Sequence, residues 1–333
     1  MSRIRRIGVL GAGAWGTTLA VVAQRAGRDV VLWARRSLQA ATLFARRENL
    51  LHLPGVSLDT SIRIAGTIEA ALEADAVLVA LPAQYLREHL AGLAWPASAA
   101  AVICAKGIER HSLKSMPEVM AEIQPGADLA MLSGPTFAGE VARGLPAAIV
   151  IASADIALAE RLAGALATRE LRPYASDDVT GVALGGAVKN VLAIGCGIVV
   201  GRGLGDNALA ALLTRGLTEL ARLVDAAGGR RETAMGLSGA GDLILTATSA
   251  QSRNTSLGVA LGRGRALEEI LAERQSVAEG VDSAAAAVAL ARRHKVEMPI
   301  CEAVAAILTG GDIDGELRRL LARPLKREIE SGD

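Results

Sequence analysis

Aromatic residues are scarce in this sequence, and neither sign of charge dominates. Trp, Tyr and Phe together make up 2% of the 333 residues, whereas hydrophobic residues as a class make up 51%. Because Ala and Gly are abundant, we expect closely packed helices and tight turns. The 36 basic and 35 acidic residues leave a formal net charge of +1. A broad basic face is therefore not predicted, and nucleic acid is not expected as a partner.

Cysteine and histidine are also rare. The three cysteines, Cys104, Cys196 and Cys301, lie far apart and show no CxxC spacing. Buried, reduced thiols in a cytoplasmic protein are the simplest interpretation. The four histidines are scattered, so no metal site is predicted, and no Ser-His-Asp pattern indicates a hydrolase.

Two apolar stretches imitate targeting or membrane segments. The first residues have a basic head and then an apolar run, as a signal peptide does, but three glycines within residues 11–16 favour a strand and a turn. The run 184–200 is long enough to suggest a membrane span. Lys189 lies inside it, and a central lysine costs about 3 kcal/mol in a membrane. We therefore expect a soluble, cytoplasmic protein without stable membrane insertion.

The apolar pattern changes near the middle of the chain, and 333 residues suit two domains. In the first half, short apolar runs alternate with helical patterns, which predicts a Rossmann-type, mostly parallel, doubly wound α/β sheet. The expected strands are 7–10, 29–33, 75–81, 101–105, 129–132 and 147–152. The expected helices between them are 16–26, 36–46, 67–74, 84–92, 112–123, 137–142 and 155–167.

A polar turn at 174–181 marks the expected boundary. Beyond it the periodicity is helical throughout. The sequence thus predicts a dinucleotide-binding domain at 1–178 and an all-helical substrate domain at 179–333. The expected helices of the second domain are 179–200, 206–227, 232–236, 241–248, 254–262, 266–272, 281–294, 299–308 and 313–321.

A glycine motif follows the first expected strand. Gly11, Gly13 and Gly16 form a GxGxxG pattern that opens a helix. This context suits a tight turn, a close backbone approach to a pyrophosphate and a helix N-terminus that faces the phosphates. A merely structural glycine-rich turn is the alternative.

The second strand ends in two arginines, Arg35 and Arg36, where an NAD-specific site would carry Asp or Glu. Two guanidinium groups suit a 2′-phosphate, which favours NADPH over NADH. A basic, solvated helix start is the alternative.

Three residues follow the next strands of the expected sheet. Lys106 comes just past the strand 101–105, and Gly134 and Thr136 follow the strand 129–132. Ligands of such sheets bind beyond the carboxyl ends of the strands. Lys106 can therefore reach a phosphate or a carboxylate, unless it is a surface lysine. Thr136 can bond a ligand or cap the helix that follows.

Lys189 stands in the apolar run described above, with Gly185 and Gly186 at helical spacing. These glycines leave room for a ligand against the helix. A lysine desolvated in this way has a lowered pKa and can exchange a proton near neutrality. The alternative is a lysine whose stem reaches the surface.

Further along the chain, Asp242 follows two glycines and can orient or pair with a lysine. The cluster Ser252, Arg253 and Asn254 offers several donors for a phosphate. A helix start followed by a capped loop would explain the same residues.

Together these segments resemble the soluble bacterial NAD(P)-dependent glycerol-3-phosphate dehydrogenases over about residues 5–325. The resemblance rests on GAGAWGTTLA, AKGIE, SGPTFAGEVARGLPAA, GVALGGAVKNVLAIG, GLSGAGDLILT and QSRN. It implies reversible reduction of dihydroxyacetone phosphate to sn-glycerol 3-phosphate, the backbone for phospholipids, with NADPH and with NADH as a second option. It leaves a homodimer open.

The resemblance also implies residue roles, beginning with proton transfer by Lys189. Implied substrate contacts are Lys106, Gly134, Thr136, Lys189, Asp242, Ser252, Arg253 and Asn254. Implied cofactor contacts are Gly11, Gly13, Trp15, Gly16, Arg35, Arg36, Lys106, Ala138, Arg253, Val277 and Glu279.

Two other functions fit parts of the same pattern. A β-hydroxyacid dehydrogenase would keep the architecture and a helix lysine, but would act on a carboxylate. A regulator that binds NADP(H) without catalysis would keep only the nucleotide site.

Overall fold

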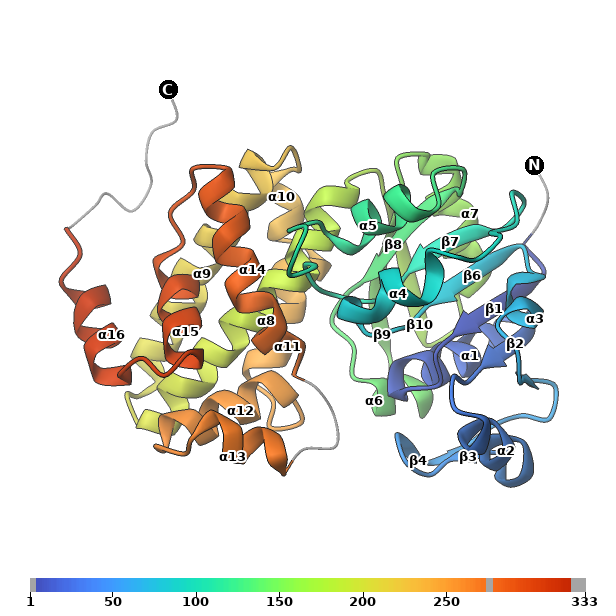
Figure 1. Cartoon of the computed structure of the whole chain (residues 1–333), viewed down its shortest axis with the longest axis horizontal. Coiled ribbons are helices and arrows are strands. Elements are labelled where there is room, and N and C mark those ends of the chain that lie inside the picture. The colour runs from blue at the N-terminus through green and yellow to red at the C-terminus, as the bar shows by residue number, and fades with distance from the viewer. Residues whose placement is uncertain (1–3, 274–277, 325–333) are drawn as a thin grey trace.

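The computed structural model describes residues 4–273 and 278–324. A sheet flanked by helices lies beside a group of packed helices (Figure 1). We call residues 4–178 the sheet domain and the described residues from 179 onward the helical domain. The strands, in chain order, are β1 (Arg6–Leu10), β2 (Asp29–Trp33), β3 (Glu48–Asn49), β4 (Leu53–Ser57), β5 (Arg63–Ala65), β6 (Ala76–Val79), β7 (Ala100–Ile103), β8 (Leu129–Ser133), β9 (Ala147–Ala152) and β10 (Leu171–Ser176).

Eight of these strands form one sheet in the order β10-β9-β8-β7-β6-β1-β2-β5, while β3 and β4 form a separate antiparallel pair. All neighbours in the large sheet are parallel except β8 and β9. The predicted mostly parallel, doubly wound sheet is therefore confirmed. Its central strands are continuous apolar runs because helices cover both faces of the sheet.

The sheet also contains strands that the apolar runs did not predict. β10 lies inside the sequence that we interpreted partly as a polar turn, so the expected turn at 174–181 is wrong for its first three residues. The reason is the position of β10 at the sheet edge, where Arg172 and Tyr174 are partly or largely exposed. An edge strand does not need the apolar run that marks a central one.

Helices pack on the two faces of the sheet and produce two apolar clusters. Leu19 and Leu162 lie in one cluster, and Leu86 and Val119 lie in the other. The helices of this domain are α1 (Ala14–Arg25), α2 (Ser37–Arg46), α3 (Glu69–Leu72), η1 (Ala83–Tyr85), α4 (Leu86–Leu90), α5 (Met116–Ile123), α6 (Ala138–Ala142) and α7 (Ile156–Leu166).

The helical domain is built around α8 (Val179–Arg202), which Figure 1 shows in its middle. Asp178 caps the start of this helix by accepting a hydrogen bond from the Gly181 backbone N–H at 2.8 Å, and Gly203 ends it with a φ of 71°. By length and composition α8 could cross a membrane, but it is buried within the protein. The long apolar run of the sequence is thus a core helix.

Most of the remaining helices pack on α8, and the others pack on those helices. Each expected helix of this half is present within two residues at either end. They are α9 (Asp206–Ala226), α10 (Arg231–Ala234), η2 (Leu237–Gly241), α11 (Asp242–Ala247), α12 (Arg253–Gly262), α13 (Leu267–Ala272), α14 (Glu279–Arg293), α15 (Pro299–Leu308) and α16 (Ile313–Leu321). All three cysteines are buried free thiols, as expected.

One buried carboxylate ties two of these helices together. Glu219 of α9 is 2% exposed and accepts hydrogen bonds from the backbone N–H groups of Ile300 at 2.7 Å and Cys301 at 3.2 Å. It therefore caps the N-terminus of α15 from a neighbouring helix. Burial raises the pKa of Glu219 from 4.5 to about 7, although the two amide donors favour its charged form.

This pKa predicts a pH-dependent stability. Because it lies above the ordinary value, the folded protein holds the proton more tightly than the unfolded chain. The contribution of Glu219 to stability therefore falls as pH rises from about 4.5 to about 7. Between pH 5 and pH 8, Glu219 should lower the free energy of unfolding by an amount on the order of 1 to 3 kcal/mol. We expect this decrease to be absent in Glu219→Gln.

The measurement is the free energy of unfolding of both proteins at the two pH values. Glu302→Gln, on the partly exposed side of α15, serves as the control and should change with pH as the unmodified protein does. An identical pH dependence in the unmodified and Glu219→Gln proteins would show that Glu219 stays charged when folded.

Candidate active site

A carboxylate and two lysines meet where the two domains touch. Lys106 follows β7 in the sheet domain, Lys189 lies in the middle of α8, and Asp242 begins α11. The Lys106 Nζ lies 2.5 Å from Asp242 Oδ2, and the Lys189 Nζ lies 3.0 Å from Asp242 Oδ1. The structure therefore brings together three residues that the sequence predicted to be functional.

This cluster is buried, and its charges compete with the cost of burial. Burial alone would raise the pKa of Asp242, but the ammonium groups of Lys106 and Lys189 outweigh it, and the pKa is lowered. Burial lowers the pKa of Lys189, and the Asp242 carboxylate opposes this only in part. Lys189 therefore holds its proton less tightly than an ordinary lysine, as expected from its apolar surroundings.

The sequence did not reveal a further partner of Lys189. The Lys189 Nζ also donates a hydrogen bond to Thr246 Oγ1 at 2.9 Å. Thr246 stands four residues after Asp242 on α11, which is a spacing that places both side chains on one helix face. Thr246 could have been identified in the sequence from this spacing.

The glycines beside Lys189 have a different use from the one predicted. A Cβ atom on Gly186 would lie 2.8 Å from Ser133 Oγ and 3.3 Å from Lys106 Cγ, and one on Gly185 would lie 3.1 Å from Ser238 Oγ. The space beside these glycines is filled by protein atoms. They allow other elements to approach α8 closely, so the expected room for a ligand is wrong here.

Gly134 and Thr136 stay close to this cluster. Gly134 has a φ of +142°, and its carbonyl oxygen accepts a hydrogen bond from Lys106 Nζ at 3.2 Å. The Thr136 hydroxyl donates to the same carbonyl at 3.3 Å. Thr136 is not the N-cap of α6, which is Phe137, so the capping alternative is wrong.

The cluster Ser252, Arg253 and Asn254 forms the start of α12. Ser252 is its N-cap, and the Ser252 hydroxyl accepts a hydrogen bond from the Thr255 N–H at 3.1 Å. Arg253 is exposed, whereas Asn254 is buried. The Asn254 Nδ2 donates to Asn190 Oδ1 at 2.9 Å, so this residue links α12 to the neighbour of Lys189.

The glycine motif lies at the switch point of the sheet, between β1 and β6, where dinucleotides bind in such folds. Gly11 has a φ of +108°, and a Cβ on Gly16 would lie 1.9 Å from the Gly11 carbonyl oxygen. A Cβ on Gly13 would meet no described atom within 4 Å, and no described side chain caps α1. The residues thus fit a pyrophosphate at the start of α1.

The other expected cofactor residues come from several elements of both domains. Arg35 and Arg36 are exposed after β2, and Trp15 of α1 is half-buried. Ala138 begins α6, and Glu279 begins α14. Burial raises the pKa of Glu279, against the lowering effect of Arg253 and the two lysines. Val277 lies outside the described residues.

His52 is a neighbour of the cofactor region that the sequence did not single out. Its pKa is lowered first by burial and then by the charges of Arg36 and Arg253, which come from the two domains. Its backbone is held by Asn49, whose side chain also donates to the Ala12 carbonyl oxygen at 2.9 Å. Figure 1 shows β3, β4 and α12 at the same end of the two domains.

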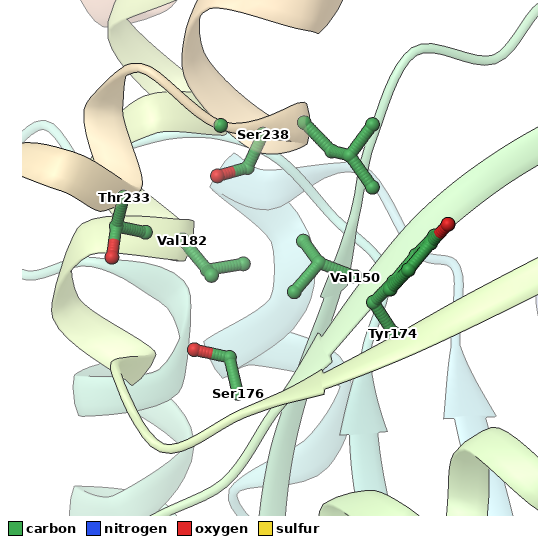
Figure 2. A pocket seen from close by; sticks show the side chains of 8 residues that line it. Val150, Tyr174, Ser176, Val182, Thr233 and Ser238 are labelled. Carbon is green, nitrogen blue, oxygen red and sulfur yellow. The ribbon is translucent and has the colours of Figure 1, made fainter.

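A separate cavity lies at the seam between β9, β10, α8 and η2 (Figure 2). The hydroxyl groups of Ser176 and Ser238 lie on either side of Val182 in this view. None of the eight residues that line this cavity is a lysine, arginine, aspartate or glutamate. It therefore lacks the charged groups of the Lys189 cluster, which remains the candidate reaction centre.

Comparison with known proteins matches both halves of the chain to one family. The N-terminal model of the NAD-dependent glycerol-3-phosphate dehydrogenases matches residues 6–159, and the C-terminal model matches residues 178–314. The chain belongs to this family. The resemblance predicted from the motifs is thereby confirmed, and the chain is an oxidoreductase.

Close relatives cover nearly all of this chain. The glycerol-3-phosphate dehydrogenase [NAD(P)+] of Rhodospirillum rubrum is 57% identical over 98% of this chain and 94% of its own length. That of Parvibaculum lavamentivorans is 55% identical over 97% and 98%. The crystal structure of the Coxiella burnetii enzyme has a TM-score of 0.91 at 37% identity, covering 96% of this chain and 99% of its own. The β-hydroxyacid dehydrogenase alternative is not favoured.

The geometry predicts that Asp242 tunes Lys189. Because the carboxylate raises the pKa of Lys189 against burial, Asp242→Asn should lower that pKa further and leave less protonated lysine near neutrality. We expect kcat in the reductive direction to fall by about tenfold or more at pH 8, with the decline beginning at a lower pH.

The profile of kcat against pH checks this expectation. Asp282→Asn is the matched control, because Asp282 also forms an ion pair across the two domains, with Arg110 at the surface. If kcat of Asp242→Asn begins to decline at the same alkaline pH as kcat of the unmodified protein, Asp242 does not raise the pKa of Lys189.

Proposed function

We propose that this chain catalyses the reversible reduction of dihydroxyacetone phosphate to sn-glycerol 3-phosphate, with NADPH as the preferred cofactor and NADH as a second one. The observation that carries the proposal is the buried contact of Lys106 and Lys189 with one carboxylate, that of Asp242. Lys106 follows the carboxyl end of β7, and Asp242 begins α11. The family membership supports the same reaction.

Lys189 supplies the proton of this reaction. A nicotinamide cofactor, when bound, would supply the hydride for C2 of the ketone. As negative charge develops on the ketone oxygen, the Lys189 ammonium stabilises it and transfers a proton from Nζ, which leaves a hydroxyl group. Asp242 and Thr246 hold the Lys189 Nζ in place through hydrogen bonds of 3.0 and 2.9 Å. Lys106 adds a second positive charge beside the same carboxylate.

The start of α12 holds the phosphate. The first N–H groups of a helix have no partner within it and favour an anion. Arg253 adds a guanidinium group at this end, and Ser252 fixes the first turn as its N-cap. In this proposal Asn254 contributes mainly through its backbone, because its side chain bonds Asn190. Gly134 and Thr136 line the substrate beside Lys106.

The cofactor would bind along the sheet domain. The backbone at Gly11, Gly13 and Gly16 would hold its pyrophosphate, and Arg35 and Arg36 would donate hydrogen bonds to the 2′-phosphate. The rest of the cofactor contacts Trp15, Lys106, Ala138, Arg253, Val277 and Glu279. We further propose a cytoplasmic enzyme that supplies glycerophospholipid synthesis, forms a homodimer and does not insert into membranes. The burial of α8 inside the protein supports the last point.

The role of Lys189 is tested by Lys189→Ala. Loss of a general acid should lower kcat for dihydroxyacetone phosphate by about a hundredfold or more, while NADPH binding survives. Both quantities are measured, by absorbance at the nicotinamide band and by cofactor titration. Lys114→Ala, which removes a surface lysine paired with Glu122, is the control. Near-normal turnover of Lys189→Ala would refute the role.

The cofactor preference is tested by the double substitution Arg35→Ala and Arg36→Ala. NADPH alone carries the 2′-phosphate, and each lost charge-assisted contact is worth about 1.5–3 kcal/mol. The Michaelis constant for NADPH should therefore rise much more than that for NADH. Arg46→Ala, at the other end of α2, should affect neither. An equal rise of the two Michaelis constants would show that Arg35 and Arg36 do not bind the 2′-phosphate.

A further inference from the structure

A salt bridge holds the loop that carries Lys106. We call residues 106–110, which follow β7, the β7 loop. Glu109 of this loop is 7% exposed. Arg87 of α4 donates to both of its carboxylate oxygens, from Nε to Oε1 and from a terminal nitrogen to Oε2, each at 2.9 Å. The Ser112 hydroxyl donates to the same Oε2 at 2.5 Å. Glu109 thus accepts three hydrogen bonds, although the proposed reaction gives it no role.

A second side chain holds the backbone of the β7 loop. Gln84 of η1 donates from Nε2 to the Ile108 carbonyl oxygen at 2.9 Å, and its Oε1 accepts from the Arg110 N–H at 3.2 Å. Gly107 allows this close approach, because a Cβ on it would lie 2.8 Å from Ala83 Cβ. The loop is therefore fastened to η1 and α4 through both backbone and side chain.

The same loop also contacts the helical domain. The Ile108 side chain is fully buried and belongs to the apolar cluster around α8. Arg110 forms an ion pair with Asp282 of α14. From this loop the Lys106 ammonium reaches Asp242 at 2.5 Å. Any shift of the loop relative to η1 and α4 would therefore change the position of that ammonium.

Stability alone does not explain the Arg87–Glu109 pair. Hydrogen bonds from Arg87 lower the pKa of Glu109 despite its burial, so the pair is ionised near neutrality. The desolvation cost of a buried ion pair often cancels its attraction, and an apolar pair of similar size would stabilise the loop as well. An arginine that binds both oxygens of a carboxylate adds a fixed geometry. Side chains of a reaction centre need such support to stay within about 0.5 Å of their working position.

We propose that Arg87 and Gln84, through their contacts with the β7 loop, position Lys106 for its role in the reaction. Glu109 anchors the loop, and all three are positioning residues that act through Lys106. The proposal rests on the proposed function, in which Lys106 contacts the substrate and the cofactor. It adds that the AKGIE segment works as a unit, in which the lysine binds and the glutamate, three residues later, sets where the lysine lies.

Displacement of Lys106 has a measurable consequence at Lys189. Burial lowers the pKa of Lys189, and the Asp242 carboxylate opposes this. The Lys106 ammonium lowers the pKa as well, while Glu279 raises it. If Lys106 moves away, Lys189 keeps the Asp242 carboxylate and loses the repulsion, so its pKa rises. Because reduction needs the protonated lysine, the alkaline decline of kcat should then begin at a higher pH.

The test compares Glu109→Gln with Lys106→Met, in which the ammonium itself is lost. Glutamine keeps the size of the side chain, but its amide nitrogen cannot accept a hydrogen bond from Arg87. In Glu109→Gln we expect kcat/KM for dihydroxyacetone phosphate to fall by about tenfold or more. In both variants the alkaline decline of kcat should begin at a higher pH than in the unmodified protein. The measurement is kcat and kcat/KM against pH with saturating NADPH.

Arg87→Lys provides a second variant, because lysine keeps the charge but lacks the planar fork that binds both oxygens. It should change kcat/KM and the alkaline decline as Glu109→Gln does, and it carries the test if Glu109→Gln does not fold. The double variant should be little worse than either single one, because the two residues share one contact. The control is Glu122→Gln, which removes only the second, more exposed partner of Arg87. This control should leave both quantities unchanged.

Two results would overturn the positioning role. One is an unchanged kcat/KM for dihydroxyacetone phosphate in Glu109→Gln and Arg87→Lys. The other is a lower Tm of these variants with an alkaline decline at the original pH, while Lys106→Met shifts that decline. The salt bridge would then serve the stability of the loop alone. Failure of the proposed function is distinguishable, since the unmodified protein would not reduce dihydroxyacetone phosphate, or Lys106→Met would itself change neither quantity.

Discussion

The carboxylate of Asp242, shared between Lys106 and Lys189, is the interaction on which the rest of the site depends. It joins the sheet domain to the helical domain at a buried point. Removing either lysine would leave less compensation for a buried charge, which is the costly case for buried ion pairs. The two domains are therefore held together by the same charged groups to which we assign the proposed reaction.

The charge balance of this cluster suits its proposed ligand. Two ammonium groups share the single carboxylate of Asp242, while the Glu279 carboxyl lies within the influence of Arg253 and the same two lysines. A phosphate ester brings two negative charges into a region of low dielectric constant, where such attraction is strong. Its negative charge also offsets the repulsion between the two lysines. The proposed substrate would thus add negative charge beside a cluster in which two lysines share one carboxylate.

Much of this arrangement could be predicted from the sequence, and the exceptions have physical reasons. Interior strands such as β2 and β9 consist mainly of apolar residues, so their bounds were predicted to the residue. β3 and β5 have two and three residues, too few for a pattern. Lys189 could be predicted because a charge in an apolar helix is conspicuous.

Other parts of the site depend on distances between segments far apart in the chain. Lys106 and Asp242 are 136 residues apart in the sequence, so no local sequence pattern indicates that they are in contact. Gly258 and Gly262 of α12 are visible in the sequence, but the sequence does not show that they contact α8. His52 escaped notice for the same reason, since the two arginines near it come from different domains.

The central position of α8 has a consequence for how the chain is made. During synthesis α8 emerges before α9, α12, α14 and α15, the helices that cover most of its length. Only its first turns, with Val182 and Ala183, join the apolar cluster of the sheet domain. Until more than a hundred further residues have followed, the nascent chain carries a long apolar helix with little to shield it from water. The sheet domain can form early, but α12, α14 and α15 must all be synthesised before the most hydrophobic segment is enclosed.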